Sequence, residues 1–527
     1  MAKRRRTILS FLWMLAVTAF GLVMLFAATA RAADDLQAQV DDLSRQVESL
    51  KKEVAAAQAG KPLGKSIGDW LTIGGDYRFR IDSLRGEVPS FYNFMDPAYQ
   101  GWLMGGMVGP APLTAGFDVK NDVLYTNRFG INLKAKATRN VTVSARLVMY
   151  KTFGSQDDAA VSGLSTAPGV VQPFFADRVG VFDGTEGHVP SDGKILVDYA
   201  YATWNNIFDQ PIWFSVGRRP STGGIPSHLR ENREKAGNAG IPAILVDYAF
   251  DGMVLGYAPD IEALPGAYAK ICYGRGFENG FTTTSGNGLH DTDMIGVSVV
   301  PYDTDPLYVD LQWNRGMNIF DFPVIRSNTI FGNTTPTTDL GDIDWYGITA
   351  LSTLKDIGPG RLNVFASAAM SVTHPNENLS NGMAGLLYTP SLEARDDKSG
   401  GAFYVGGRYD FNKNRTKVGL EYNHGSKNWI AFAPAADDIW TSKLGTRGNV
   451  YEAYLIQEFS YEPLSSYLSK TFVRLGYQYY DFEYTGSSNW VGSPLRIDDL
   501  ATNPGFAQML IPMKNARDVY ATLEVRF

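Results

Sequence analysis

Basic residues recur at every second position, or at a multiple of two, within three short segments near the start of the chain. They are Arg78, Arg80, Arg128, Lys134, Lys136 and Arg146. In extended strands this spacing puts all the side chains of a segment on one face. Asp76 and Asp82 share the same phase and offset the positive charge only in part. A row of cations on one wall attracts anions through its long-range field, so the spacing favours anion preference. A wall of mixed charge with little selectivity is the alternative.

Residues that could support catalysis or metal binding form no motif. The histidines fall in expected loops or at strand ends, at His188, His228, His290, His374 and His424. No local Ser-His-acid pattern accompanies them, so we do not expect an enzyme. Asp291/Asp293 and Asp342/Asp344 could bind Ca²⁺ in a loop, but acidic loop residues are usually solvated, and we predict no metal site. Cys272 is the only cysteine, which excludes an intrachain disulfide. Without a Cys-x-x-Cys-His motif the chain carries no covalently attached haem, and we predict no cofactor.

The first 32 residues have the features of a cleaved signal peptide. Lys3 to Arg6 form a basic start, an apolar run covers Ile8 to Ala30, and Ala30-Arg31-Ala32 supplies a cleavage site after Ala32. Because the apolar run is long, an uncleaved membrane anchor is the alternative. Removing 1–32 takes away five of the 48 basic residues and leaves 43 against 55 acidic residues, a net charge of −12. That charge disfavours nucleic acid as a partner.

Residues 33–60 have the heptad pattern of a short coiled coil. The seam consists of Leu36, Val40, Leu43, Val47, Leu50 and Val54. About three heptads are marginal alone, so we expect the helix to associate with copies of itself. The pattern does not decide between a dimer and a trimer. A single amphipathic helix lying on the barrel or on a periplasmic partner is the alternative. A linker, 61–69, follows.

From Trp70 onward the dominant signal is the alternation of apolar and polar residues. Leu71, Ile73, Tyr77, Phe79 and Ile81 alternate with polar or charged neighbours, as in a strand with one face toward lipid and one toward water. No later apolar run is long enough for a membrane helix. The only other structure that satisfies all backbone hydrogen bonds in lipid is a closed barrel. We therefore predict an all-β transmembrane antiparallel β-barrel over 70–527, preceded by the short α-helical coiled coil.

The alternation predicts about sixteen strands, within a range of 14 to 18. They cover 70–82, 123–138, 141–151, 195–205, 211–218, 244–258, 266–276, 292–301, 307–315, 343–354, 361–373, 401–411, 416–424, 449–460, 471–484 and 516–527. The sixth, seventh, twelfth and fourteenth alternate weakly. Their connections are alternately short and long, as in outer-membrane barrels, where the short turns are periplasmic. An even number of strands puts both termini on the periplasmic side.

The last strand indicates a family. Val519, Ala521, Leu523, Val525 and the terminal Phe527 alternate with polar residues. With the signal peptide and the preceding strands, this ending resembles the Gram-negative outer-membrane porin superfamily over about 70–527. The leading coiled coil indicates a porin-like subgroup whose specific function is unknown. The resemblance implies an outer-membrane location, reading of Phe527 by the barrel-assembly machinery, and a homo-oligomer in contact with lipid.

The resemblance also implies a constriction. In these porins the loop after the fifth strand folds inward and narrows the channel. Here that region carries Arg218, Arg219, Arg230, Glu231, Arg233, Glu234 and Lys235. A solvated surface helix is the alternative, since Glu231 and Lys235 are four residues apart.

Sixteen strands enclose an aqueous lumen unless loops fill it. The sequence thus predicts a porin-type channel for passive diffusion of small hydrophilic solutes or ions, with a preference for anions. The alternative is a barrel scaffold: a sleeve for a partner such as a multihaem cytochrome, or a tether to the cell envelope.

Overall fold

The computed structural model describes residues 67–155, 184, 187–233, 242–322, 325–328, 332–433, 437–459 and 469–527. The predicted signal peptide and the coiled-coil helix with its seam lie outside these residues, so both stay predictions.

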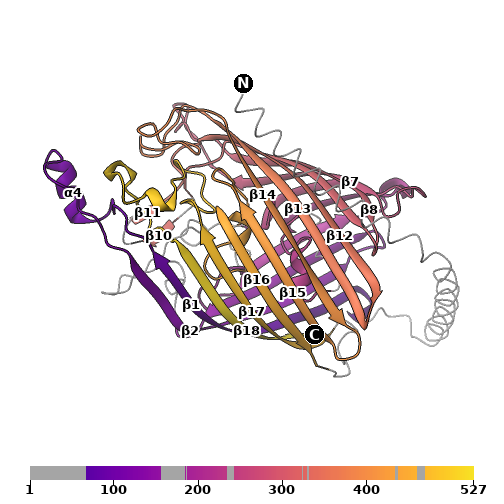
Figure 1. Ribbon diagram of the computed structural model, residues 1–527. Helices are drawn as coiled ribbons and strands as arrows, with labels where there is room; N and C mark the ends of the chain where they lie inside the picture. The colour runs from indigo at the N-terminus through magenta and orange to yellow at the C-terminus, as the bar shows by residue number, and fades with distance from the viewer. Residues whose placement is uncertain are drawn as a thin grey trace, which may run out of the picture.

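Sixteen antiparallel strands form one closed barrel (Figure 1). Their bounds are β1(Leu71–Val88), β2(Phe117–Lys136), β3(Val141–Thr152), β4(Leu196–Trp204), β5(Ile212–Ser221), β6(Tyr248–Tyr257), β7(Tyr268–Phe277), β8(Thr292–Asp303), β9(Tyr308–Met317), β12(Gly341–Ile357), β13(Gly360–Pro375), β14(Lys398–Phe411), β15(Thr416–Gly425), β16(Gly448–Glu458), β17(Lys470–Phe482) and β18(Asn515–Arg526). Each strand pairs with the next, and β1 pairs with β18 to close the ring. Each of the sixteen predicted strands overlaps one of these, so the predicted barrel is confirmed.

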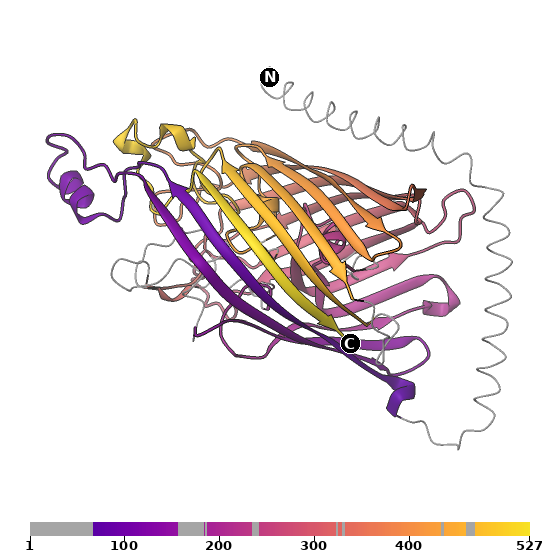
Figure 2. The same cartoon turned by 60° about the horizontal axis from the view of Figure 1, so that its bottom comes forward.

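A few short elements lie outside the barrel wall. The helices are α3(Ile67–Trp70), which occupies the end of the predicted linker, α4(Pro97–Met104) and α7(Ser227–Arg230). Four 3-10 turns and a small hairpin complete the set: η3(Ile207–Asp209), η4(Lys443–Gly445), η5(Ile497–Asp499), η6(Pro504–Phe506), β10(Ile325–Asn328) and β11(Gly332–Thr334). In the described part of the chain, no helix is both long and apolar enough to cross a membrane. Helix α4 projects beyond one end of the barrel (Figures 1 and 2).

The two ends of the barrel differ as the connection lengths predict. At one end, called the turn end here, lie the start of β1, the C-terminus and the short connections 137–140, 205–211, 258–267, 304–307, 358–359, 412–415 and 459–469. At the other, the loop end, the strands are joined by 89–116, 153–195, 222–247, 278–291, 318–340, 376–397, 426–447 and 483–514. Several strands, such as β1 and β12, extend further toward the loop end than their alternation predicts.

The outer face of the barrel exposes apolar side chains. Exposed large hydrophobic residues stand at outward positions of consecutive strands, among them Ile73, Val216, Leu255, Ile271, Leu311, Leu420, Leu455, Leu475 and Val519. Ile73 and Leu420 are each 64% exposed. An apolar band of this extent is unfavourable in water and is what lipid contact requires. Inward positions instead carry most of the buried polar side chains.

One predicted strand was wrong at its start. The run Ile244-Leu245-Val246 precedes β6 and does not belong to it, because β6 begins only at Tyr248. These three apolar residues are almost fully buried within the largest hydrophobic cluster. A short apolar run fits a buried segment as well as a strand, and periodicity alone cannot tell them apart.

The barrel seam closes over a glycine. Gly75 of β1 and the terminal Phe527 exchange two backbone hydrogen bonds, of 2.7 and 3.0 Å. A Cβ atom at position 75 would lie 2.5 Å from the carbonyl oxygen of Gly130 and 2.7 Å from the ring of Phe527. Only a residue without a side chain fits between these two neighbours. The reading of Phe527 by the assembly machinery stays a prediction.

We expect Gly75→Ala to lower the stability of the folded barrel by about 1–3 kcal/mol, because the added methyl group overpacks the seam. The measurement is the temperature at which the purified barrel loses its compact, fast-migrating form on SDS gels. Gly101→Ala in α4 is the matched control, because a Cβ there meets no atom within 4 Å. Equal transition temperatures for the two variants would contradict this account of the seam.

Candidate functional site

Two connections at the loop end fold into the barrel and pack against its inner wall. The segment 242–247 and the segment 426–433 run side by side: Val246 bridges Phe432, and the amide of Phe432 donates to the carbonyl of Leu245 at 2.9 Å. Their apolar side chains are buried against inward residues of the wall, including Trp345, Phe365 and Tyr404. The indole of Trp345 also donates to the carbonyl of Ile430 at 2.8 Å. Burial of this apolar surface explains why the two segments leave the solvent.

The first of these connections, which follows β5, also reaches the part of the wall formed by β14–β18. Helix α7 and the residues after it present backbone carbonyls to basic side chains of β14, β17 and β18. The contacts are Arg408 Nη1 to Leu229 O at 2.6 Å, Arg474 Nη1 to Arg230 O at 2.6 Å and Arg526 Nη1 to Asn232 O at 2.9 Å. The ammonium group of Lys417 on β15 donates to the Asn232 side chain at 2.6 Å. Cations of the wall thus bind carbonyls at and just after the end of the short helix, where the regular helical hydrogen bonds run out.

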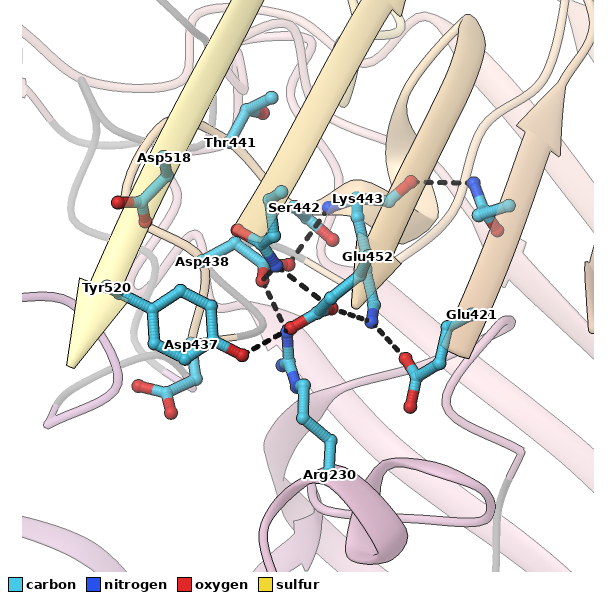
Figure 3. Close-up of polar contacts among 12 residues, drawn as sticks. Arg230, Glu421, Asp437, Asp438, Thr441, Ser442, Lys443, Glu452, Asp518 and Tyr520 are labelled. Carbon is cyan, nitrogen blue, oxygen red and sulfur yellow. Dashed lines mark hydrogen bonds and ion pairs between the residues drawn. The ribbon is translucent and has the colours of Figure 1, made fainter. Parts of the chain in front are cut away.

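A buried ionic network joins the two inward connections to this wall (Figure 3). Arg230 of α7 contacts Asp438 at 2.7 Å and Glu452 of β16 at 3.2 Å. Lys443 lies between Glu452 and Glu421 of β15 and forms an ion pair with each. The hydroxyl of Tyr520 on β18 donates to Glu452 at 2.7 Å. Two cations therefore face three carboxylates in a place from which water is largely excluded.

A second ionic cluster lies beside the first. Arg78 of β1 forms a bidentate pair with Asp437 of the inward connection. Arg80 bonds Asp82 at 2.6 Å and Asp518 of β18 at 2.8 Å. Burial alone would raise the pKa of Asp437, but the adjacent Arg78 outweighs burial and holds this pKa well below its ordinary value. Asp437 is therefore ionised, and it neutralises Arg78.

The six cations predicted to line the pore all stand at inward positions, but most do not meet open water. Arg78 and Arg80 are buried in the pairs just described. Arg146 contacts Asp76 at 2.7 Å and Asp198 at 3.1 Å, while Arg128 lies 3.7 Å from Asp76. Lys134 and Lys136 are exposed near the turn end. The strip is inward as predicted, but carboxylates offset its arginines more fully than Asp76 and Asp82 alone would. Their acidic partners Asp437, Asp518 and Asp198 are distant in sequence, so the local pattern could not reveal them.

The residues predicted for the constriction loop divide into three groups. Arg230, Glu231 and Arg233 lie in the inward connection, which makes the alternative of a solvated surface helix wrong for Arg230, since this side chain is buried. Glu234 and Lys235 lie outside the described residues. Arg218 and Arg219 belong to no loop, because β5 continues to Ser221. Alternation points Arg218 outward, toward Asp251 at 3.6 Å, and Arg219 into the lumen.

The lumen keeps one notable open space, between the inward connection and the wall β5–β9. This cavity measures about 320 Å³. It reaches from Trp213 and Tyr268 near the turn end to Ser221 and Phe250 near the loop end. Among its lining residues are two cations, Arg219 and Lys270, and no carboxylate. The sequence pattern missed Lys270, because the glycine-rich seventh strand alternates too weakly to reveal which side chains face inward.

The residues considered for metal binding are neutralised by arginines. Arg275 contacts Asp291 and Asp293, each at 2.6 Å. Arg315 contacts Asp342 at 2.7 Å and Asp344 at 3.1 Å. In the described parts of the chain, no group of three or more His, Cys, Asp or Glu residues is arranged to hold a metal ion.

The fold defines a closed β-barrel of sixteen antiparallel strands. A family model described as "Protein of unknown function (DUF3373)" matches residues 118–527, and the chain belongs to this family. Among curated proteins no match is found.

The solved structures to which the chain is similar include outer-membrane proteins. OprB of Pseudomonas putida is 10% identical, with 88% of this chain and 95% of that chain covered and a TM-score of 0.41. An anion-selective porin from Comamonas acidovorans is 11% identical, with 87% and 99% covered and a TM-score of 0.39. OmpT of Vibrio cholerae, in its trimer form, is 13% identical, with 87% and 100% covered and a TM-score of 0.35. Solved outer-membrane porins are thus among the structures to which this chain is similar.

We expect Asp437→Asn to destabilise the barrel by about 3–5 kcal/mol, because Arg78 keeps its charge in a buried place and loses the carboxylate that neutralises it. The measurement is urea-induced unfolding of the detergent-solubilised barrel. Asp122→Asn is the matched control, because its pair with Arg85 spans 3.6 Å with both side chains more than half exposed, and such pairs contribute about 0–1 kcal/mol. An equal loss in both variants would contradict a special role for the buried pair.

Asp247, an acid in the connection that follows β5, predicts that the stability of the barrel depends on pH. Burial raises the pKa of Asp247 to about 7, although nearby His188 opposes the effect. Between about pH 4 and pH 7 the folded chain then holds a proton that the unfolded chain has lost, so the stability contribution of Asp247 declines as the pH rises. Unfolding experiments at several pH values should show a weaker decline over this window for Asp247→Asn. Parallel stability curves for the two proteins would refute this assignment.

Proposed function

We propose that this chain is a porin-type channel of the Gram-negative outer membrane, through which small hydrophilic solutes or ions diffuse passively. The observation that carries the proposal is the pairing of an apolar, exposed outer face with an inner wall that bears many polar and charged side chains and borders an open space. An outer face of this kind suits lipid, and a polar lumen suits water and solutes. In this orientation the turn end and both termini lie in the periplasm.

The inward connections act as the constriction of the proposed channel. They are anchored on β14–β18 and β1 by the ionic clusters, so solutes pass along the wall β5–β9, where the cavity lies. The narrowness of this route restricts passage to small solutes. Its lining contains Arg219 and Lys270 without a carboxylate, and a ring of this charge favours anions.

The filled lumen also bears on the alternative, a sleeve around a partner such as a multihaem cytochrome. Side chains of the inward connections occupy the space that an enclosed protein would need. This observation favours a channel over a sleeve. A tether through the coiled-coil helix at 33–60, assembly as a dimer or trimer, a periplasmic partner and the absence of enzymatic activity all stay proposals.

We expect discrete conductance steps from the purified protein in a planar bilayer, with a reversal potential in a salt gradient that indicates anion preference. Arg219→Gln combined with Lys270→Gln should shift the reversal potential toward cation preference, because both positive charges leave the route. Lys355→Gln is the matched control, since Lys355 is exposed at the turn end and pairs with Asp305.

Folded, inserted protein that never conducts would overturn the channel. A reversal potential that is unaffected by the double substitution, or equally affected by the control, would instead remove the anion route while leaving the pore.

A further inference from the structure

Glycine backbone without side chains forms part of one wall of the cavity beside β5–β9. Gly252, Gly274 and Gly296 face it from three neighbouring strands, β6, β7 and β8. A Cβ atom would lie 2.0 Å from the carbonyl oxygen of Tyr273 at Gly252 and 2.2 Å from the side chain of Asn314 at Gly296, so these two positions favour glycine. At Gly274 a Cβ atom would already lie 2.8 Å from the side chain of Phe250, so even alanine is tight there. The glycines therefore leave bare backbone along a cavity whose volume suits a compact molecule, at the lower end of the usual size for ligand sites.

The charge in this cavity is positive and only partly compensated. Arg219 forms no ion pair with any described residue, and its Nε atom is buried without a hydrogen-bond partner. Its guanidinium group lies 5.5 Å from the centre of the Tyr201 ring. Lys270 extends from β7 into the same space. The nearby carboxylate of Asp310 on β9 offsets part of the charge of Lys270. The buried Nε donor of Arg219 has no partner, which is costly, and an anionic group that binds the guanidinium would offset this cost.

The rest of the lining is apolar or aromatic. Trp213 and Tyr268 pack edge to face, with ring centres 6.2 Å apart, toward the turn end. Phe250, Val254 and Met294 complete the apolar part, and Ser221 and Asn314 supply polar groups. A simple inorganic anion would leave this apolar surface without a partner, whereas an organic body would cover it.

From this combination we infer that the cavity is a binding subsite for small organic acids, whose carboxylate meets Arg219 and Lys270 while an aromatic or branched aliphatic body lies against Trp213, Phe250 and Tyr268. The inference rests on the proposed function, because it names the class of solute that the route selects. A carboxylate accepts the planar donors of an arginine in a bidentate manner, which fixes the orientation of the bound acid.

The test measures binding of benzoate to the folded, detergent-solubilised full chain by isothermal titration calorimetry. Two probes separate the parts of the inference: acetate has the carboxylate without the body, and benzyl alcohol has the body without the charge. We expect benzoate to bind at least about tenfold more tightly than either, and Arg219→Gln to weaken benzoate about tenfold, as loss of a hydrogen bond to a charged group does. Lys134→Gln is the control, because Lys134 is an inward cation outside this cavity.

Equal binding of benzoate and benzyl alcohol would overturn the inference, and so would an unchanged affinity in Arg219→Gln. Conductance in bilayers is measured on the same preparations. Binding without conductance refutes the channel and leaves the subsite, whereas conductance without binding refutes the subsite alone.

The natural chain offers a second test that needs no substitution. Cys272, the only cysteine, lines the cavity as a free thiol. An anionic methanethiosulfonate reagent should modify Cys272 faster than a cationic one, by about tenfold or more, since the nearby cations concentrate anions. Added benzoate should slow the reaction. Equal rates, faster modification by the cationic reagent, or no protection by benzoate would each contradict the subsite.

Discussion

Charges on the inner wall of this barrel must be paired wherever the inward connections exclude water, and the arrangement of the lumen depends on that constraint. An unpaired buried arginine or carboxylate costs several kcal/mol, on the order of the whole stability margin of a domain. Arg78, Arg80 and Arg230 avoid this cost through Asp437, Asp518, Asp438 and Glu452. The pairs join distant parts of the chain, so the same contacts that neutralise the wall also hold the connections in place.

The anchoring makes the lumen asymmetric. Carbonyls of 229–232 are bound by cations from β14, β17 and β18, and the apolar residues 244–246 and 430–432 pack against inward residues of β12–β14. The far wall, β5–β9, bears glycines and small residues and makes fewer charged contacts with the connections. Open space therefore remains on that side. The cavity lies between the connections, which are fixed from the opposite wall, and a wall that bears Gly252, Gly274 and Gly296.

The sequence predicts the barrel well, because the alternation of apolar and polar residues follows directly from the contrast between lipid and lumen. Strand number, short and long connections and the inward phase of Arg78 could all be derived from it. The interior was much less predictable. The run Ile244-Leu245-Val246 fits a strand as well as a buried connection. Arg218 and Arg219 were expected in a loop, but β5 continues beyond its predicted end and points the two side chains to opposite faces. Pairs such as Arg78–Asp437 depend on how two distant segments meet in three dimensions, and a pattern of neighbours carries no information about that.

Selectivity in such a lumen depends on the places where a charged side chain has no opposite charge nearby. It depends little on the net charge of the chain. The whole chain has a net charge of −7, and β1–β3 carry six inward basic residues, yet neither number describes what a solute meets. The arginines of β1–β3 are offset by carboxylates, and Lys134 and Lys136 lie near the turn end. Arg219, by contrast, faces the cavity with an aromatic ring as its described contact. A single unmatched guanidinium group in a narrow, poorly hydrated route has a stronger effect on a passing anion than several matched groups, because its field is not cancelled nearby and is weakly screened.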